Sequence, residues 1–408
     1  MAEENPPEMA KDQKVALTPT GRVVFPDRAP TPSQIAAAAS LPDNAQAEYP
    51  VLSKKIPASH YTSQERYDLE QEKLFKKLPV PIAPSAMVGE PGSYVCREGF
   101  GRPLIVSRDK DGQVHVLVNA CKHRGAVVAP EEETQKGRLL VCPFHAWSYE
   151  LNGKLAGVPR SEFFENLDKS QHNLNSLPCV EKGGIIWAWL GDPAEADFNR
   201  LNPEFVADLD AFGMKDMHLF AYERLRFKAN WKLLQDTFHE GYHVIRLHAR
   251  TLGAMYEDSA YRVDRLGGYM RQISGRRGYT RDMAEGNANS INYMRQTYVF
   301  NYTLFPNAVL IFSQDYVNVL IFKPQGPDDT LVDNMMLTTV APSIDKLQQK
   351  WQKSVDLTMG QAFPEDFMAS EISQKGLSSG ALEHLLIGGM EEAVYRFHEI
   401  IDEEMAAR

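Results

Sequence analysis

The sequence predicts an α+β protein with two domains, in which an all-β domain precedes an antiparallel sheet combined with long helices. Three observations lead to this prediction. Residues 80–194 hold short apolar runs separated by turns such as Asp111-Gly112 and Asn152-Gly153. Residues 297–341 hold longer runs that alternate with period two, and apolar residues at helical spacing follow towards the C-terminus. A chain of 408 residues is long enough to build two cores.

The composition is that of a globular protein with an acidic balance. A net charge of −10 argues against non-specific binding to nucleic acid. We expect Cys96 and Cys179 to be two separate buried thiols and not a disulfide. No apolar run reaches the 18 residues of a membrane-spanning helix, and the acidic start does not resemble a signal peptide. We therefore expect no membrane association and a cytoplasmic location.

The expected elements follow the chain in order. Residues 1–60 are rich in Pro, Ala and charge, which predicts an extended arm. The first domain is expected over 61–200 and opens with a helix at 62–77. The second domain is expected over 201–408, with a helix at 201–211, strands at 220–228, 297–302, 308–314, 317–322 and 331–341, and helices at 343–360 (capped by Ser343), 364–377 and 391–405.

Two pairs of metal-binding residues lie in the first domain. Cys121 and His123 form one arm, Cys142 and His145 form the other, and 18 residues separate His123 from Cys142. Two thiolates on one iron and two imidazoles on the other are the ligands of a Rieske [2Fe–2S] cluster. A zinc site is the alternative, but zinc fingers pair Cys with Cys and His with His, whereas each arm here mixes the two. The arms therefore predict a Rieske cluster.

A second group of such residues lies in the other domain. His239, His243 and His248 are interspersed with Asp236 and Glu240, which predicts the 2-His-1-carboxylate site of a non-haem Fe(II) oxygenase. Histidines four residues apart share a helical face, which favours the pair 239/243. Histidines five apart need a helix break, which the pair 243/248 requires. The residues alone leave both pairs open.

Both stretches resemble the alpha, or terminal oxygenase, subunits of Rieske non-haem iron oxygenases, the aromatic-ring-hydroxylating dioxygenase family. The likeness extends over about residues 62–405. Ala146 stands where many relatives have Gly, and Thr237 stands where the family has Asn. The matching residues are Cys142, Pro143, Phe144, His145, Trp147 and Tyr149 in the first stretch, and Asn230, Trp231, Lys232, Glu240, Tyr242, His243 and His248 in the second.

The resemblance implies a fold and residue roles. It implies a Rieske [2Fe–2S] domain followed by a catalytic domain of the helix-grip (START-like) type. It selects His243 and His248 as iron ligands, which leaves His239 packed or facing solvent. Asp366 becomes the third ligand, with Glu365 as its rival, because it fits a family pattern that continues through Glu371, Gln374 and Gly376.

The resemblance also implies an electron path. Glu240 would bridge His243 and a cluster histidine of a neighbouring subunit, expected to be His145. The family implies a homotrimer that receives electrons from a reductase and, in part of the family, from a ferredoxin; a beta subunit is left open.

Together the two sites predict an enzyme, a terminal oxygenase that uses O₂ to hydroxylate an organic substrate. Phe238, Val244 and the strands at 297–322 are expected to line the pocket, and their apolar character favours an aromatic or hydrophobic substrate, ring dihydroxylation and a role in aromatic catabolism. A monooxygenase performing O- or N-dealkylation is the alternative, and a Rieske electron-transfer protein is the non-enzyme alternative. The arginines of the irregular segment 250–296 are expected to be solvated surface charge, with binding of an anionic substrate or partner as the alternative.

Overall fold

The computed structural model describes residues 25–130, 133–284 and 289–407, so most of the first half of the expected arm lies outside the described residues. The described part of the arm is not simply extended. Its helix α1 (Pro32–Ala39) begins at a capping box formed by Thr31 and Gln34. Its strand β1 (Lys54–Pro57) pairs with β20 (His384–Ile387) near the other end of the chain.

The first domain consists of short antiparallel strands, as expected. A five-stranded sheet has the order β10-β5-β4-β3-β6, and two three-stranded sheets have the orders β11-β12-β2 and β7-β8-β9. The last of these carries the second cluster arm between two of its strands. The strands are β2 (Val80–Pro84), β3 (Ser93–Arg97), β4 (Leu104–Arg108), β5 (Val114–Val118), β6 (Gln135–Lys136), β7 (Leu139–Val141), β8 (Ser148–Glu150), β9 (Leu155–Gly157), β10 (Ser176–Leu177), β11 (Cys179–Lys182) and β12 (Ile185–Ala188).

The helix expected at the start of this domain is divided in two and packs elsewhere. It comprises α2 (Ser59–Thr62) and α3 (Gln64–Glu70), which continues as a π-helical turn. Buried Glu70 accepts a hydrogen bond from Lys232 Nζ at 2.7 Å and from Trp231 Nε1 at 2.9 Å. These partners lie in the second domain, so the helix is attached to that domain. The predicted domain boundaries at 60 and 200 stay predictions.

The second domain is built on a seven-stranded antiparallel sheet, with order β13-β19-β18-β17-β16-β15-β14. Two strands occupy the segment that was expected to be irregular, because buried ion pairs there disguise the strand pattern. Arg271, for example, is 3% exposed and bonds Asp208 at 2.7 Å. The strands are β13 (His218–Phe227), β14 (Tyr261–Leu266), β15 (Tyr269–Gly275), β16 (Tyr298–Leu304), β17 (Ala308–Phe312), β18 (Tyr316–Gly326) and β19 (Asp329–Thr338).

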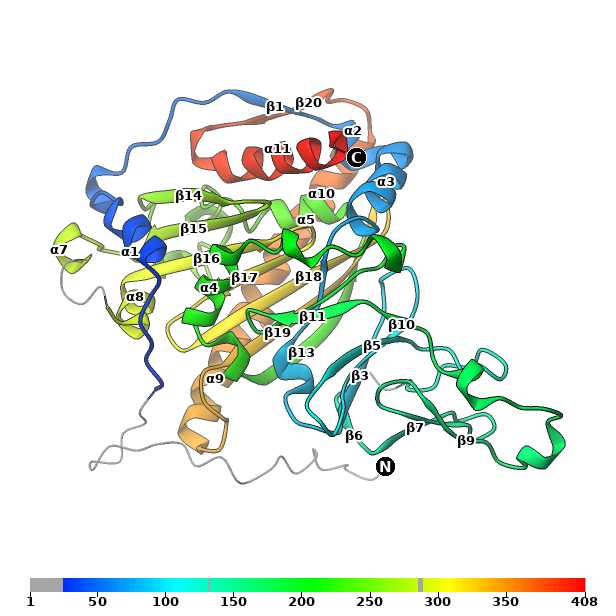
Figure 1. Cartoon of the computed structure of the whole chain (residues 1–408). Coiled ribbons are helices and arrows are strands. Elements are labelled where there is room, and N and C mark those ends of the chain that lie inside the picture. Colours follow the sequence, from blue (N-terminus) through cyan, green and yellow to red (C-terminus); the bar gives the residue numbers. More distant parts are fainter. Residues whose placement is uncertain (1–24, 131–132, 285–288, 408) are drawn as a thin grey trace, which may run out of the picture.

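Helices cover both faces of this sheet (Figure 1). On one face Phe212, directly after α4, stacks on Phe312 with ring centroids 3.9 Å apart. On the other face Phe367 of α10 contacts Phe227 at 4.4 Å. The helices are α4 (Pro203–Ala211), α5 (Trp231–Asp236), α6 (Val244–Leu247), α7 (Arg281–Ala284), α8 (Ile291–Thr297), α9 (Asp345–Leu357), α10 (Phe363–Ser378) and α11 (Glu392–Ala406).

The expected cap of α9 was wrong, because the helix begins after Ile344, and Ser343 makes no cap. Among the described residues, none of these helices has the length and apolarity needed to cross a membrane. Cys96 and Cys179 are separate thiols, as predicted, but only Cys96 is fully buried, whereas Cys179 is partly exposed.

A buried charge cluster joins the two domains. Asp333 of β19 accepts hydrogen bonds from Arg97 of the first domain, from Lys323 and from Arg224, and the side chains of Arg97, Lys323 and Asp333 are fully buried. Burial opposes ionisation of Asp333, but the three surrounding cations outweigh it and hold the pKa of the carboxyl well below its usual range. One carboxylate therefore neutralises cations contributed by both domains.

We expect Asp333→Asn to lower the free energy of unfolding by about 3–5 kcal/mol, because it leaves buried cations without a counter-charge. Asp329→Asn is the matched control, since Asp329 pairs with exposed Arg226 and Lys228, and should cost at most about 1 kcal/mol. Urea denaturation of both variants measures the difference. Equal losses in the two variants would contradict the assigned role of the cluster.

Candidate functional site

The two cluster arms fold into loops with the same backbone hydrogen bonds. In the first loop the Cys121 N–H bonds the Ala126 carbonyl at 2.8 Å, and the N–H of residue 125 bonds the Cys121 carbonyl. In the second loop the Cys142 N–H bonds the Trp147 carbonyl at 2.8 Å, and the Ala146 N–H bonds the Cys142 carbonyl at 3.0 Å. Residue 125 is a glycine at φ +76°, whereas Ala146 adopts φ +57°, where a side chain is disfavoured.

The loops place two cysteines beneath two histidines. Cys121 and Cys142 are 4% and 2% exposed, and the rings of His123 and His145 lie 4.6 Å apart at 70°. His145 is exposed, whereas His123 stacks on Trp147 with centroids 5.0 Å apart. The His123 Nδ1 is buried and has no hydrogen-bond partner among the described residues, as expected of an atom that faces a cofactor. The donor set and its geometry fit a [2Fe–2S] cluster with thiolates inside and imidazoles near the surface.

The tyrosine two residues after Trp147 supports the first arm. Tyr149 Oη lies 3.2 Å from Cys121 Sγ and accepts the Lys122 N–H at 3.0 Å. Burial first, and then the contact with the Cys121 sulfur, raises the pKa of the Tyr149 hydroxyl. The hydroxyl therefore stays protonated and can donate to a cluster-bound sulfur, a contact of the kind that tunes the reduction potential.

The second site brings together His243, His248 and Asp366. Their facing donor atoms lie within 4.8 Å of one another. Asp366 Oδ1 is 3.3 Å from His243 Nε2 and 3.1 Å from His248 Nε2. His248 can face His243 because α6 is only one turn long, which is the helix break that a spacing of five residues requires. Three convergent ligands with an open side are the arrangement of a facial triad.

Two glutamates hold the opposite edges of the imidazoles. Glu240 Oε1 contacts His243 Nδ1, and Glu365 Oε2 lies 2.7 Å from His248 Nδ1. Each glutamate therefore fixes the ring tautomer that leaves Nε2 free to bind a metal. Glu365, the predicted rival of Asp366, thus contacts a histidine instead of joining the triad. In the sequence, the only sign that Glu365 contacts a ligand was its position directly before Asp366.

The charges of this site suit a divalent cation. Burial disfavours the imidazolium of His243, yet the hydrogen bonds to Asp366 and Glu240 outweigh burial and raise its pKa to about 10. At His248, burial also lowers the pKa of the imidazole, but the hydrogen bond and the charge of Asp366, together with the hydrogen bond to Glu365, outweigh burial, so the pKa is raised. Three carboxylates around two imidazoles therefore attract a positive charge, which a metal ion can supply in place of the protons.

His239, the third histidine of the segment, does not join the triad. It is 2% exposed, its Nε2 lies 2.9 Å from Thr303 Oγ1, and its ring packs on Phe397 at 4.6 Å. Burial lowers its pKa to about 4, so the ring is neutral. His239 is therefore packed between the sheet and α11. This is one of the two positions expected for it, the other being a position that faces solvent.

The sheet face on the side of the triad keeps access to solvent in one part. Towards one end of β15, β16 and β17 the side chains of this face are partly exposed, whereas Met270, Thr303 and Val309 further along the same face are buried. Of the aromatic residues expected to line a pocket, Phe300, Tyr302 and Phe312 belong to the opposite, buried face, and Phe238 and Phe322 pack together on the side of the triad. The partly exposed residues are Gln272, Ser274, Val299, Asn301, Ile311 and Ser313. This surface, here called the open sheet face, is mainly polar.

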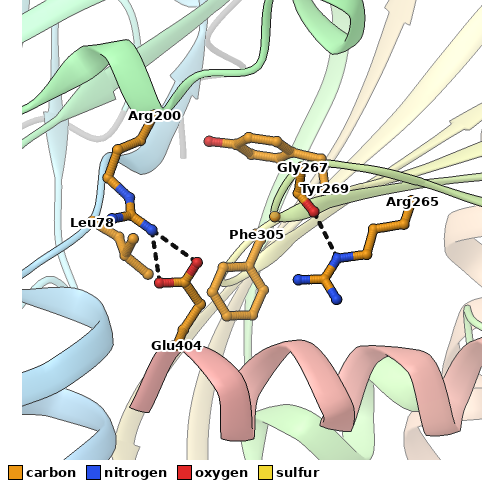
Figure 2. Close-up of a pocket in the computed structure, with 8 residues that line it drawn as sticks. Leu78, Arg200, Arg265, Gly267, Tyr269, Phe305 and Glu404 are labelled. Carbon is orange, nitrogen blue, oxygen red and sulfur yellow. Dashed lines mark hydrogen bonds and ion pairs between the residues drawn. The ribbon is translucent and has the colours of Figure 1, made fainter. Parts of the chain in front are cut away.

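A surface pocket lies elsewhere, between the β14–β15 turn and the end of α11 (Figure 2). Its volume is about 550 Å³. Its two arginines already have carboxylate partners, since Arg200 bonds Glu404 through two contacts of 2.8 Å and Arg265 bonds Glu403 at 2.5 Å. None of the triad residues lines this pocket, so it is separate from the metal site.

Comparison with known proteins places this architecture in one class. Residues 79–171 match the Rieske [2Fe–2S] domain model, and residues 214–407 match the model of the ring hydroxylating alpha subunit catalytic domain. A chain with both domains, a Rieske cluster and a mononuclear iron site is a Rieske-type oxygenase subunit. The chain belongs to the family of Rieske oxygenase alpha subunits, whose members are oxidoreductases that incorporate O₂.

Relatives within this family differ in what their names say they act on. The carnitine monooxygenase oxygenase subunit of Escherichia coli K12 is 28% identical over 83% of this chain and 88% of its own length. The corresponding subunit of Acinetobacter pittii is 28% identical, but the alignment covers 51% of this chain and only 56% of the relative. The large subunit of anthranilate 1,2-dioxygenase from Acinetobacter baylyi is 28% identical over 48% of this chain and 42% of its length.

Solved structures share the fold. A quaternary ammonium Rieske monooxygenase in complex with L-carnitine superposes with a TM-score of 0.72 at 21% identity, covering 87% of this chain and 96% of that chain. Naphthalene 1,2-dioxygenase from Rhodococcus sp. bound to indole gives 0.71 at 20% identity, covering 87% and 95%. The predicted combination of a Rieske domain and a catalytic domain of mixed helix and sheet is thus confirmed.

We expect Ala146→Gly to stabilise the first domain by about 1 kcal/mol, because glycine adopts a left-handed conformation without a steric penalty. The matched control is Ala126→Gly in the other loop. Ala126 does not have a positive φ, so glycine there should destabilise by about 0.5–1 kcal/mol. Thermal unfolding followed by circular dichroism measures both. A lower melting temperature for Ala146→Gly would refute the strain argument.

Proposed function

We propose that this chain is the terminal oxygenase of a multicomponent Rieske system and hydroxylates a small organic substrate with O₂. In this proposal Cys121 and Cys142 hold one iron of the cluster, and His123 and His145 hold the other. His243, His248 and Asp366 hold a mononuclear Fe(II). The convergence of these three donor atoms within 4.8 Å is the observation that carries the proposal. When bound, the cluster supplies single electrons and the ferrous ion activates O₂.

The protein's own groups prepare both sites. Glu240 and Glu365 accept the Nδ1 protons of His243 and His248, so that both Nε2 lone pairs face Asp366. Thr251 Oγ1 donates to Glu365 at 2.8 Å and fixes that carboxylate in turn. The open sheet face lies on the same side of the sheet as the triad, and we infer that a substrate lies along its partly exposed polar side chains.

We also propose that electrons pass between subunits of a homotrimer, from His145 of one copy through Glu240 of the next. Figure 1 supports this, because β7 and β9 beside the cluster arms lie at the far end of the molecule from α5 and α10. The exposed ring of Phe144 lies 3.8 Å from that of His145, and Val141 at the start of the same arm is 51% exposed; exposed apolar side chains of this kind suit burial in an interface. Inter-subunit electron transfer has been described for a structurally similar quaternary ammonium Rieske monooxygenase. A reductase, with or without a ferredoxin, would supply the electrons.

The sequence-based preference for an aromatic substrate and ring dihydroxylation stays a prediction. Phe300, Tyr302 and Phe312 point to the buried sheet face, whereas Phe238 and Phe322 lie on the side of the triad. A monooxygenase reaction is the second candidate. The polar open sheet face favours it, and so do the names of the carnitine and glycine betaine monooxygenase relatives. Aromatic catabolism and a cytoplasmic location stay predictions.

Metal and sulfide analysis tests the proposal directly. We expect three irons and two acid-labile sulfides per chain. His248→Ala should lose one iron while the visible spectrum of the cluster stays unchanged, and Cys142→Ser should lose the cluster. O₂ consumption with reductase and substrate should disappear in both. Two irons per chain with a complete cluster would instead identify an electron-transfer protein.

We expect Glu365→Gln to weaken Fe(II) binding at the mononuclear site by about 10–100-fold, because His248 loses the carboxylate that orients it. Competition with a chelator measures the affinity. Glu371→Gln is the matched control on the same helix, where the side chain accepts the Lys228 N–H at 2.8 Å and an amide oxygen can do the same. Unchanged iron affinity in Glu365→Gln would remove Glu365 from the site.

A further inference from the structure

Arg276 belongs to the segment 250–296, whose arginines were expected to be solvated surface charge, but Arg276 itself is partly buried. It directly follows β15, and its Nε donates to the Arg295 carbonyl at 3.0 Å. Its Nη2 is buried and has no hydrogen-bond partner among the described residues. Burial lowers the pKa of the guanidinium, and the neighbouring titratable groups that oppose this effect are two tyrosines, Tyr256 and Tyr316. A partly buried guanidinium without a facing carboxylate is costly unless something else pairs with it.

Within the described residues, the groups around Arg276 leave its Nη2 unpaired. Arg295 is 1% exposed and donates to the carbonyls of Ser313 and Tyr316, at 2.6 and 2.7 Å. Two nearby carboxylates have other partners, since Asp315 pairs with Lys350 and Glu257 Oε1 accepts hydrogen bonds from Asn44 Nδ2 and the Gly278 N–H. The Arg276 Nη2 is therefore left for an acceptor from outside the chain.

Arg276 also lies at one end of the open sheet face. It continues the alternation of Gln272 and Ser274, the two partly exposed residues of β15. Asn318, on the same face of β18, is 1% exposed, and its Nδ2 has no partner within the part of the chain that the structure describes. A second unsatisfied buried donor on this face indicates that a ligand with acceptor atoms occupies it.

The chain itself links this end to the proposed iron site. His248 is followed by a short turn whose Gly253 N–H bonds the His248 carbonyl at 2.7 Å. The same turn leads to Tyr256, whose hydroxyl is close enough to influence the pKa of Arg276. At the other end of the open sheet face, Asn301 Nδ2 donates to the Phe238 carbonyl at 3.2 Å, five residues before His243. A molecule lying on this face would therefore extend between Arg276 and the triad.

We propose that Arg276 binds the carboxylate of an organic acid substrate and so orients the substrate on the open sheet face toward the iron site. This inference rests on the proposed function and names its substrate class. A planar guanidinium pairs with a carboxylate through two parallel hydrogen bonds, and Asn318 Nδ2 can supply another donor. A phosphate monoester fits less well, because Arg295 directs its Nε and Nη2 to carbonyls, which leaves one guanidinium, that of Arg276, to balance a dianion.

The test compares matched acids and amides as ligands of the anaerobic holoenzyme. The probes are benzoate, phenylacetate and butyrate, each beside its primary amide, and calorimetry measures their dissociation constants. We expect at least one acid to bind at least 10-fold more tightly than its amide. Arg276→Gln should remove that preference, and Arg276→Lys should restore part of it. Arg281→Gln, an exposed arginine of the same segment, is the matched control and should leave it unchanged.

The outcomes separate this inference from the proposed function. Iron content and the cluster spectrum of Arg276→Gln first establish that the variant is folded. Equal binding of acids and amides, binding of no acid, or an acid preference that persists in Arg276→Gln would each overturn the role of Arg276. If acids bind through Arg276 but no compound stimulates O₂ consumption, the oxygenase proposal fails while the carboxylate site stands. If amides stimulate O₂ consumption as well as acids do, only the carboxylate site fails.

Discussion

The close approach of the Asp366 carboxylate to two imidazoles requires α10 to be fixed against the segment that carries the histidines. A stripe of polar residues fixes α10 in this position. It consists of Asp366, Ser370 and Gln374, which follow one another at intervals of four and share a helical face. Ser370 Oγ donates to the Leu233 carbonyl at 3.3 Å, and Gln374 Oε1 accepts the Asn230 N–H at 3.0 Å. Gln374 Nε2 also donates to the Tyr61 carbonyl at 3.1 Å. The same stripe therefore positions Asp366 of the triad and holds α2, which contains Tyr61.

The charge cluster around Asp333 imposes a second constraint, because it attaches the first domain to the sheet face opposite the triad. Arg97 and Asp333 meet through that face, whereas the triad lies on the side covered by α10. This arrangement leaves the cluster loops free at the end of the molecule (Figure 1). In the proposed path, a second chain would accept the electron from His145, and rigid attachment of the two domains would keep the distance between the two chains constant.

Local motifs were readable from the sequence, whereas contacts between distant segments were not. The two cluster arms and the histidine segment are short, and ligand chemistry limits what such spacings can mean. Asp366 follows His248 by more than a hundred residues and came only from the resemblance. Glu365 was ambiguous because adjacent acidic residues at a helix start also arise from the helix dipole. Strands β14 and β15 were missed because Arg271 is buried with carboxylate partners contributed by distant elements.

The position of the aromatic strand residues shows what composition alone leaves open about the substrate. A strand rich in Phe and Tyr supplies both faces of a sheet, and only register decides which face carries them. Here Phe300 and Phe312 pack against Phe212, and the opposite face retains amides and hydroxyls. That face ends at the carboxylates near the triad and, at its other end, at the unpaired Nη2 of Arg276 among the described residues. In the proposed binding mode, the opposite charges at the two ends would orient a substrate with one anionic end along the face.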